Sequence, residues 1–258
     1  MSTRYFDTPF IALAHRGGGE YAPNTGIENT LQAFRNAVDL GFTHIETDVQ
    51  ATRDGVLVCF HDPTLERVAG EPGTVGERTA AELATIRVNG TEPIPTLDDV
   101  FEALPDTCFN IDLKTEAAIT PLVATLARHQ AEDRVVIASF SQRRLSTFRH
   151  LTAGRVPTGM AAPEVAWSTL VPILPGIIAS PGAAVQAPVS QKIGPITIPL
   201  ITRHAIDAVH QANKQVHVWT IDDPEEMTRL IDLGVDGLIS DRPDVLKEVL
   251  VNRGLWHG

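Results

Sequence analysis

The chain has 258 residues, of which 43% are hydrophobic and 21% charged, and its formal net charge is −11. This composition is typical of a globular protein with a sizeable core, and the acidic balance argues against nucleic acids and anionic membranes, which favour basic partners. No stretch approaches the ~18 uninterrupted apolar residues of a membrane span, and no apolar run of signal length follows Met1. We therefore expect a cytoplasmic enzyme without stable membrane insertion, with Cys59 and Cys108 as buried free thiols.

Short apolar runs alternate with amphipathic segments along most of the chain, and this pattern indicates strands alternating with helices. The expected strands are Phe10–His15, His44–Ala51, Val56–His61, Cys108–Lys114, Val135–Phe140, Val156–Ala161, Ala183–Ala187, Val216–Ile221 and Gly237–Ser240. The expected helices are Thr30–Leu40, Ala80–Ile86, Leu97–Leu104, Ile119–His129, Ser141–Leu151, Thr202–Lys214, Pro224–Leu233 and Pro243–Asn252.

The repeated order of strand and helix predicts an α/β fold with a parallel sheet. About eight such units in ~250 residues favour a closed (β/α)8 TIM barrel, which we expect to form a single domain over residues 1–258. The alternative is an open, doubly wound sheet. Its dinucleotide-binding signature is missing, because the glycines at 17–19 do not have the GxGxxG spacing.

Two stretches interrupt the alternation. Residues 64–95 contain several glycines and few apolar runs, and they are interpreted as a small insertion after the strand that ends at His61. The Pro172–Pro199 stretch is rich in proline and glycine, and it leaves the sixth strand–helix unit without a clear place.

A histidine and an arginine, His15 and Arg16, stand where the first apolar run ends in three glycines. A titratable group beside a fixed cation at a strand end suits an anion-handling site, although a solvated loop could carry the same pair. In a TIM barrel the active site lies at the carboxyl ends of the strands, which favours the functional interpretation. His61 ends a second apolar run, and two histidines with pKa values near neutrality suit general acid and base catalysis.

Three carboxylates, Glu46, Asp48 and Asp112, also lie in expected strands and are candidates for the same site. Glu46 and Asp48 are two residues apart, so a strand places both on one face, where they would repel each other unless protonated or bound to a cation. A hard divalent metal with oxygen ligands resolves this conflict, the alternative being a surface-facing pair. Asp112 could be a third ligand and Lys114 could neutralise a phosphate oxygen, although an ordinary strand-end ion pair would have the same pattern.

Three further residues lie near the last strands. Trp219 shares a strand face with His217 and is a candidate floor for a substrate pocket, with core packing as the alternative. Asp241 is interpreted first as the cap of the final helix and second as a support of the site. The remaining histidines are interpreted as structural or solvated.

These pieces resemble, in order, the motifs of the glycerophosphodiester phosphodiesterase family, within the PLC-like phosphodiesterase TIM-barrel superfamily. The motifs are His15-Arg16-Gly17, Glu28-Asn29-Thr30, Glu46-Thr47-Asp48, His61-Asp62, Val218-Trp219-Thr220 and Asp236-Gly237-Leu238-Ile239-Ser240-Asp241-Arg242-Pro243. The resemblance covers almost the whole chain and implies the barrel with its small insertion. One departure is that the family's Glu-x-Lys is Asp112-Leu113-Lys114 here, so a metal would lie closer to this strand or be reached through water.

The resemblance implies metal-dependent hydrolysis of glycerophosphodiesters to sn-glycerol 3-phosphate and an alcohol. One divalent ion (Mg²⁺ or Ca²⁺, with Mn²⁺ as a further option) is the implied cofactor, and a small-molecule glycerophosphodiester is the implied partner. The implied roles are acid–base catalysis by His15 and His61, phosphate or substrate binding by Arg16, Lys114 and Trp219, and metal binding by Glu46, Asp48 and Asp112. The sequence leaves open which histidine is the base and whether water or the glycerol 2-hydroxyl attacks first.

Two other functions are compatible with the sequence. A lysophospholipase D or sphingomyelinase D-type phosphodiesterase would resemble the same barrel, histidine pair and acids, but secreted members typically carry disulfides and a signal sequence. A barrel that only binds phosphodiesters is the second alternative, and the presence of all the expected groups argues against it. The head group, the ion and the oligomeric state are not given by the sequence.

Overall fold

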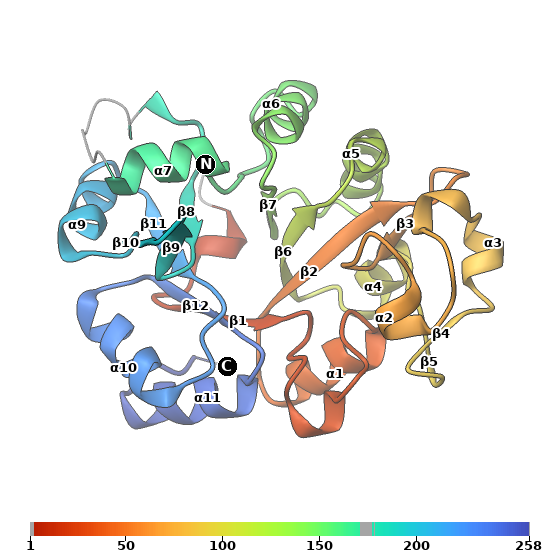
Figure 1. Ribbon diagram of the computed structural model, residues 1–258, viewed down its shortest axis with the longest axis horizontal. Coiled ribbons are helices and arrows are strands. Elements are labelled where there is room, and N and C mark those ends of the chain that lie inside the picture. Colours follow the sequence, from red (N-terminus) through yellow and green to blue (C-terminus); the bar gives the residue numbers. More distant parts are fainter. Residues whose placement is uncertain (1–2, 171–176, 178, 258) are drawn as a thin grey trace.

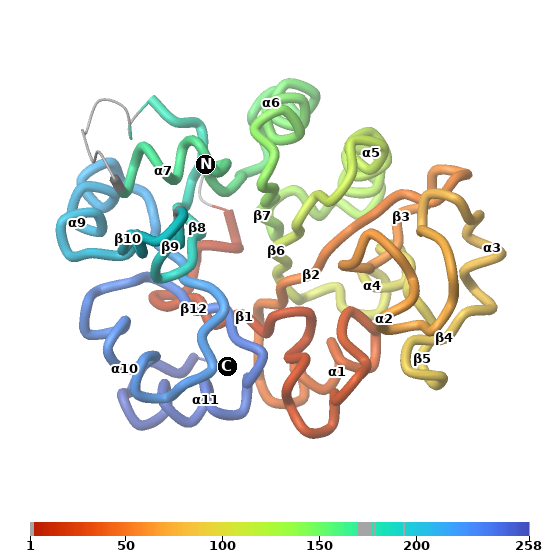
Figure 2. The backbone as a smooth tube through the Cα atoms, in the orientation of Figure 1, coloured from red at the N-terminus to blue at the C-terminus, as the bar shows by residue number. Residues whose placement is uncertain are grey.

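The computed structural model describes residues 3–170, 177 and 179–257. Its centre is a barrel of parallel strands surrounded by helices (Figure 1). In the order in which neighbours pair, the described barrel strands are β7 (Val135–Ala138), β6 (Cys108–Leu113), β2 (His44–Ala51), β1 (Ile11–His15), β12 (Gly237–Ser240), β11 (Gln215–Val218) and β8 (Ala184–Ala187). Neighbours in this series are parallel, as the alternation of strands and helices predicts. Figure 2 shows β1 and β12, from the two ends of the chain, side by side.

The segment between β7 and β8 closes the barrel without forming a regular strand. Thr158 bridges to Ile137 of β7 and Gly159 bridges to Ala184 of β8, both in parallel orientation. A Cβ atom at Gly159 would lie 2.7 Å from Oε1 of Gln186, at the end of a flexible side chain of β8, which shows how closely the two segments approach. The expected strand Val156–Ala161 is thus present as the eighth barrel position, held by isolated bridges. The predicted TIM-barrel class is confirmed, and an open sheet is excluded.

The expected strand Val56–His61 is present in a shorter form, but it is not one of the parallel barrel strands. β3 (Leu57–Cys59) pairs antiparallel with the far end of β2, with Cys59 opposite Val49. It is the return arm of a hairpin whose turn contains Gly55 at φ +83°. All three β3 residues are buried, and a short apolar run gives the same sequence pattern whichever way the strand runs.

Helices surround the barrel close to the expected positions, except for the helix Ala162–Leu170, which was not expected from the sequence. They are α1 (Leu31–Asp39), α4 (Leu97–Ala103), α5 (Ile119–Arg128), α6 (Gln142–Leu151), α7 (Ala162–Leu170), α9 (Arg203–Gln211), α10 (Pro224–Leu233) and α11 (Pro243–Asn252), joined by short 3-10 turns η2 (Ala22–Asn24) and η4 (Glu116–Ala118). Side chains cap several of their starts: Thr30, Ser141 and Thr202 each accept a hydrogen bond from a backbone N–H three residues later. Among the described helices, none combines the length and apolar character needed to span a membrane.

The residues after β3 form a small unit beside the barrel, on the right in Figure 1. It consists of α2 (Glu66–Ala69), η3 (Val75–Glu77), α3 (Ala80–Leu83), β4 (Arg87–Val88) and β5 (Glu92–Pro93). Leu65, Val75 and Leu83 are buried in a separate apolar cluster that also contains Val58 and Phe60 of the hairpin. The insertion is therefore packed against the hairpin that leads to His61.

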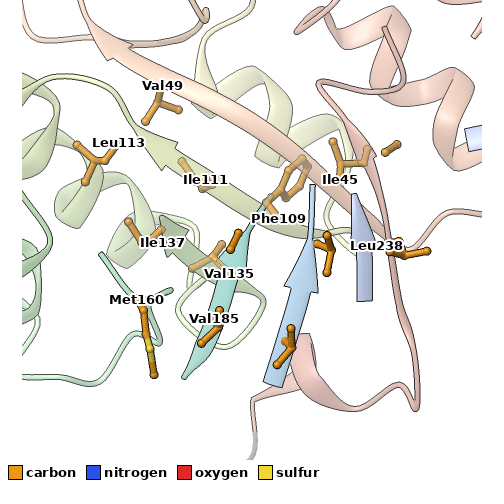
Figure 3. Close-up of a cluster of buried hydrophobic side chains, with 14 of the residues drawn as sticks. Ile45, Val49, Phe109, Ile111, Leu113, Val135, Ile137, Met160, Val185 and Leu238 are labelled. Atoms are coloured by element: carbon orange, nitrogen blue, oxygen red, sulfur yellow. The ribbon is translucent and has the colours of Figure 1, made fainter. Parts of the chain in front are cut away.

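Alternate residues of the barrel strands face two different environments. Ile45 and Val49 of β2, and Phe109, Ile111 and Leu113 of β6, belong to the large apolar cluster between strands and helices, part of which Figure 3 shows. Their neighbours Glu46, Asp48, Asn110 and Asp112 have the opposite parity and line the central cavity. Because side chains alternate along a strand, the apolar residues face the core and the polar residues between them face the cavity.

The other end of the barrel interior is closed by apolar and uncharged groups. Tyr5, from the 3-10 turn η1 (Arg4–Phe6), is fully buried with Ile11, Leu13 and Ile239. His44 is buried there too, and its Nε2 lies 2.9 Å from the carbonyl oxygen of Tyr5. This plug leaves one end of the barrel for the functional cavity.

The described part of the Pro172–Pro199 stretch contains β8 and an antiparallel hairpin of β9 (Ser190–Ile193) and β10 (Ile196–Pro199). Residues 172–176 and 178 of the stretch lie outside the described residues. The hairpin lies in the left half of Figure 1, below α7, and its residues Gln191 and Ile198 line the central cavity. Its contribution to the site is described below.

Candidate active site

A cavity of about 430 Å³ opens at the carboxyl ends of the barrel strands. One side of it is polar and is lined by His15, Arg16, Glu46, Asp48, His61, Asn110, Asp112 and Lys114. The other side is largely apolar and is formed by α7, the β9–β10 hairpin, the segment after β7 and the end of β11. The structure thus brings together every predicted site residue, including Trp219, in one cavity.

His15 ends β1 and is held by the aspartate that follows β12. Its Nδ1 lies 2.8 Å from Oδ1 of Asp241, and its Nε2 lies 3.8 Å from Oε2 of Glu46. Because a carboxylate accepts a hydrogen bond, Nδ1 carries the proton and Nε2 is the nitrogen free for chemistry. Burial acts to lower the pKa of His15, but the Glu46 and Asp241 carboxylates outweigh it and raise that pKa.

The first interpretation of Asp241, as a helix cap, is wrong. The N-cap residue of α11 is Arg242, and it makes no side-chain capping bond. The parallel register that sets Ala14 beside Ser240 carries Asp241 next to His15. The backbone N–H of Asp241 donates to Oδ1 of Asp222 at 2.8 Å, and this bond holds the residues that follow β12 in place. The second interpretation, support of the site, is the one that the geometry favours.

His61 has the same kind of partner. Its Nδ1 lies 2.7 Å from Oδ1 of Asp62, which leaves Nε2 available. The hairpin explains how it reaches the cavity: Phe60 N–H donates to the carbonyl of Asp48 at 3.0 Å, which places His61 at the level of the site. Two imidazoles, each bound through Nδ1 to a carboxylate, therefore line one cavity.

The three predicted metal ligands lie on neighbouring strands in register. Asp48 of β2 is paired with Asp112 of β6, and Glu46 of β2 is next to His15 of β1. All three carboxylates are buried. Burial and the nearby Asp48 charge raise the pKa of Glu46 to about 8, and burial raises that of Asp112. The site therefore concentrates more negative charge than its own cations neutralise.

Two cations sit among these acids. The Lys114 ammonium lies 2.8 Å from Oδ1 of Asp48 and 2.7 Å from Oδ2 of Asp112. The Arg16 guanidinium lies 3.3 Å from Oδ2 of Asp48 and 2.9 Å from Oε1 of Glu28. Burial acts to raise the pKa of Asp48, but Lys114 and Arg16 outweigh it and lower that pKa. Both cations also line the cavity, within reach of an anionic ligand.

The acids fit a hard divalent cation in their chemistry. Oxygen donors from three buried carboxylates are what Mg²⁺ and Ca²⁺ prefer, and Oδ1 of Asp112 is buried without a hydrogen-bond partner. Among the described residues, no three His, Cys, Asp or Glu side chains are gathered closely enough to form a metal-binding cluster. Lys114 occupies the space between Asp48 and Asp112, and its ammonium would have to move for both to bind one ion.

Several functional contacts were not assigned from the sequence. Glu28 binds Arg16, and Asn29 donates to Oδ2 of Asp48 at 2.9 Å while it accepts from the Thr47 hydroxyl. The Glu28-Asn29-Thr30 motif was the available signal, although its roles follow only from the fold. His217 lies in β11, which ends just before Trp219, and its side chain is fully buried between Gln186 and Gln215, outside the cavity lining.

The chain was compared with known proteins. The model of the glycerophosphoryl diester phosphodiesterase family matches residues 15–245. A Mycobacterium tuberculosis protein named "Probable glycerophosphodiester phosphodiesterase 2" is 39% identical over 96% of this chain and 93% of its own length. A glycerophosphodiester phosphodiesterase of Caldanaerobacter subterraneus is 30% identical, over 95% of this chain and 98% of its own.

Solved structures have the same fold. An Oleispira antarctica phosphodiesterase in complex with the product sn-glycerol-3-phosphate has a TM-score of 0.76 at 23% identity, covering 93% of this chain and 96% of that one. A Thermotoga maritima glycerophosphodiester phosphodiesterase has a TM-score of 0.74 at 22% identity, covering 93% and 98%. With the family match, the two sequence relatives and the geometry of the cavity, the chain belongs to the glycerophosphoryl diester phosphodiesterase family.

Proposed function

We propose that this enzyme hydrolyses glycerophosphodiesters to sn-glycerol 3-phosphate and an alcohol. The observation that carries the proposal is the pair of histidines in one cavity, each with Nδ1 bound to a carboxylate and Nε2 left free. Such a pair can remove one proton and deliver another at neutral pH. The relatives named as glycerophosphodiester phosphodiesterases and the Oleispira antarctica complex with its product support the same substrate class.

The two partly buried cations position the phosphate. Arg16 and Lys114 line the cavity beside the histidines, and a phosphodiester would replace part of their present contacts with carboxylates. Arg16 offers a planar fork that suits two phosphate oxygens, and Lys114 acts as a point charge. These contacts hold the phosphorus between the two imidazoles and reduce the charge that repels a nucleophile.

The histidines divide the proton transfers. One Nε2 removes a proton from the attacking hydroxyl, which belongs to water or to the glycerol 2-hydroxyl, while the other imidazole protonates the leaving alkoxide. If the glycerol hydroxyl attacks, a cyclic phosphate forms first and water then opens it with the two roles exchanged. Both routes need the same two residues, His15 and His61.

A divalent ion belongs to this proposal. The family is generally dependent on divalent metals, and Glu46, Asp48 and Asp112 would hold one ion, Mg²⁺, Ca²⁺ or Mn²⁺. When bound, it would neutralise negative charge on the phosphoryl oxygens. Its charge would also offset the burial and the Asp48 repulsion that raise the pKa of Glu46. Lys114 would then be released from Asp48 or Asp112 toward the substrate.

A second candidate is hydrolysis of single-chain lysophospholipids. The apolar side of the cavity, which includes Phe140, Met160, Val165, Ile198 and Leu200, exceeds what a polar head group needs. Curated relatives from Rattus norvegicus and Homo sapiens, 26% and 24% identical, are named "Lysophospholipase D GDPD1". An acyl chain lying on this wall would keep the phosphodiester at the same polar groups.

The two candidates are separated by substrate and product. The protein is incubated with glycerophosphocholine or with lysophosphatidylcholine, after treatment with a chelator and after addition of Mg²⁺, Ca²⁺ or Mn²⁺. The proposal predicts release of glycerol 3-phosphate from glycerophosphocholine, loss of turnover with chelator and recovery with one of the ions. Choline phosphate as the product, or no turnover with any ion, would contradict it. Turnover of lysophosphatidylcholine alone would favour the second candidate.

A further inference from the structure

Arg67, in α2 of the insertion, makes four hydrogen bonds to two carboxylates. Its Nε and Nη2 donate to Asp62 at 2.5 and 2.9 Å, and its Nη1 and Nη2 donate to Glu28 at 2.9 and 2.6 Å. The guanidinium therefore binds both side chains with two bonds each. This planar, forked geometry is specific to arginine, because an ammonium cannot present it.

Each of the two carboxylates holds a group that lines the cavity. Oδ1 of Asp62 accepts from Nδ1 of His61 at 2.7 Å, and Oε1 of Glu28 accepts from Nη1 of Arg16 at 2.9 Å. The hydrogen bond from Arg67 is the main cause that lowers the pKa of Asp62 to about 2. Burial acts to raise the pKa of Glu28, and the Arg67 and Arg16 bonds lower it instead. Both acids stay ionised acceptors.

We propose that Arg67 is a positioning residue of the reaction: through Asp62 it orients the His61 imidazole, and through Glu28 it orients the Arg16 guanidinium. The inference rests on the proposed function, in which His61 transfers a proton and Arg16 binds the phosphate. In this proposal the insertion contributes to the reaction, because its Arg67 side chain supports both the His61 imidazole and the Arg16 guanidinium. Arg67 itself lies outside the cavity lining and does not touch the reacting atoms.

The local fold holds Arg67 in place. Leu65, two residues earlier, is fully buried in the insertion cluster, and the carbonyl of the next residue, Val68, accepts a hydrogen bond from Asn89 N–H at 2.7 Å. The Arg67 side chain is 50% exposed, so its ion pairs add little to the stability of the fold. Removing them is expected to disturb orientation while the protein stays folded.

The test compares three variants with the wild type. Arg67→Met removes the guanidinium and keeps an unbranched apolar stem, and Arg67→Lys keeps the charge without the fork. Arg53→Met is the matched control, because Arg53 is a comparably exposed arginine near the insertion whose ion pair with Glu82 has no link to His61 or Arg16. Steady-state kinetics with glycerophosphocholine and thermal unfolding are measured for each variant. The His61 side-chain nitrogen resonances are recorded by NMR.

We expect Arg67→Met to lower kcat and raise KM, together reducing kcat/KM by about tenfold or more, with an unchanged melting temperature. Arg67→Lys recovers only part of the loss, and Arg53→Met behaves like the wild type. The NMR spectrum of Arg67→Met shows a changed Nδ1 environment for His61 and an unchanged one for His15. In Asp62→Asn, the further Arg67→Met change lowers kcat by less than it does in the wild type, because the link to His61 is already weakened, while the effect through Glu28 and Arg16 remains.

Unchanged kcat and KM in Arg67→Met, or full recovery with lysine, would overturn the inference while the wild type remains active. If the wild type lacks the activity, the proposed function fails, and the His61 resonances still decide whether Arg67 orients the imidazole. Identical His61 resonances in the wild type and Arg67→Met would also overturn the inference, because they would show that Arg67 does not orient the imidazole.

Discussion

Each histidine of the cavity is fixed through the same nitrogen. Nδ1 of His15 binds Asp241 and Nδ1 of His61 binds Asp62, so both Nε2 atoms are left without these carboxylate bonds, as the proposed proton transfers require. An aspartate in this position sets the tautomer and stabilises the imidazolium that forms during a proton transfer. The two aspartates come from different parts of the chain and meet only in the folded protein.

Replacing the partner of His15 tests this arrangement. Asp241→Asn removes the negative charge while keeping the shape, and we expect kcat to fall about 10- to 100-fold, because the amide supports the protonated imidazole poorly. Asp244→Asn is the control, since Asp244 pairs with Arg242 and does not contact His15. A kcat within twofold of the wild type in Asp241→Asn would show that the hydrogen bond is not needed.

The positions of single site residues could be predicted from the sequence where they depend only on the spacing of neighbouring residues. The spacing of Glu46 and Asp48 placed both on one strand face, and the structure has both lining the cavity. Asp241 was harder, because an aspartate shortly before a proline-initiated helix has the same local pattern as a cap. Its role depends on the register of β1 with β12, which is a tertiary property.

The elements were predictable to different degrees. The helix Pro224–Leu233 was predicted with its observed ends, because proline and glycine mark its start and end. β3 was expected as a strand, but a short apolar run does not reveal that it runs antiparallel to β2. The Val156–Ala161 segment forms isolated bridges rather than a regular strand, and its apolar pattern does not distinguish the two.

The turn after β1 leaves no space for side chains at its second glycine. Gly18 has φ +93°, and a Cβ there would lie 2.5 Å from Cγ of Pro243, at the start of α11. We expect Gly18→Ala to be destabilised by roughly 1–3 kcal/mol and to lose activity, because strain and overlap move the His15–Arg16 turn. Urea unfolding and kcat/KM measure both effects, with Gly70→Ala as a control of positive φ without steric overlap. Equal losses in the two variants would show that backbone strain alone is responsible.

The β9–β10 hairpin forms part of the apolar wall through Ile198. Ile198→Asn is expected to weaken binding of lysophosphatidylcholine by about tenfold, because it removes a buried apolar contact, and to leave KM for glycerophosphocholine unchanged. Thr197→Asn, on the exposed side of the same strand, is the control. Equal effects on both ligands would show that the wall does not select for an apolar chain.

At the scale of the whole molecule, two histidines of the described residues, His44 and His217, are buried beneath the site. Burial lowers the pKa of His44 to about 4 and that of His217 to about 3. Both values lie below the unfolded value of about 6.5, so the unfolded chain binds more protons between these limits. Stability therefore falls as the pH drops below about 6.5, by roughly 2 kcal/mol for each group at pH 5.

Urea unfolding at pH 7 and pH 5 checks this expectation. His217→Gln removes one of the two groups, and we expect its stability to decrease less between the two pH values than that of the wild type. His150→Gln, which replaces an exposed histidine, is expected to keep the wild-type decrease. The same decrease in His217→Gln would mean that burial of this imidazole does not govern the acid response.

Acid–base catalysis by His15 and His61 is tested most directly by the single-turnover release of glycerol 3-phosphate from glycerophosphocholine. We expect His15→Ala and His61→Ala each to reduce the rate by about 10²- to 10⁴-fold, as for the loss of a general acid or base, while His150→Ala keeps the wild-type rate. All three variants should retain the wild-type circular dichroism spectrum. A folded His15→Ala or His61→Ala variant that turns over at the wild-type rate would contradict the assignment of the active site.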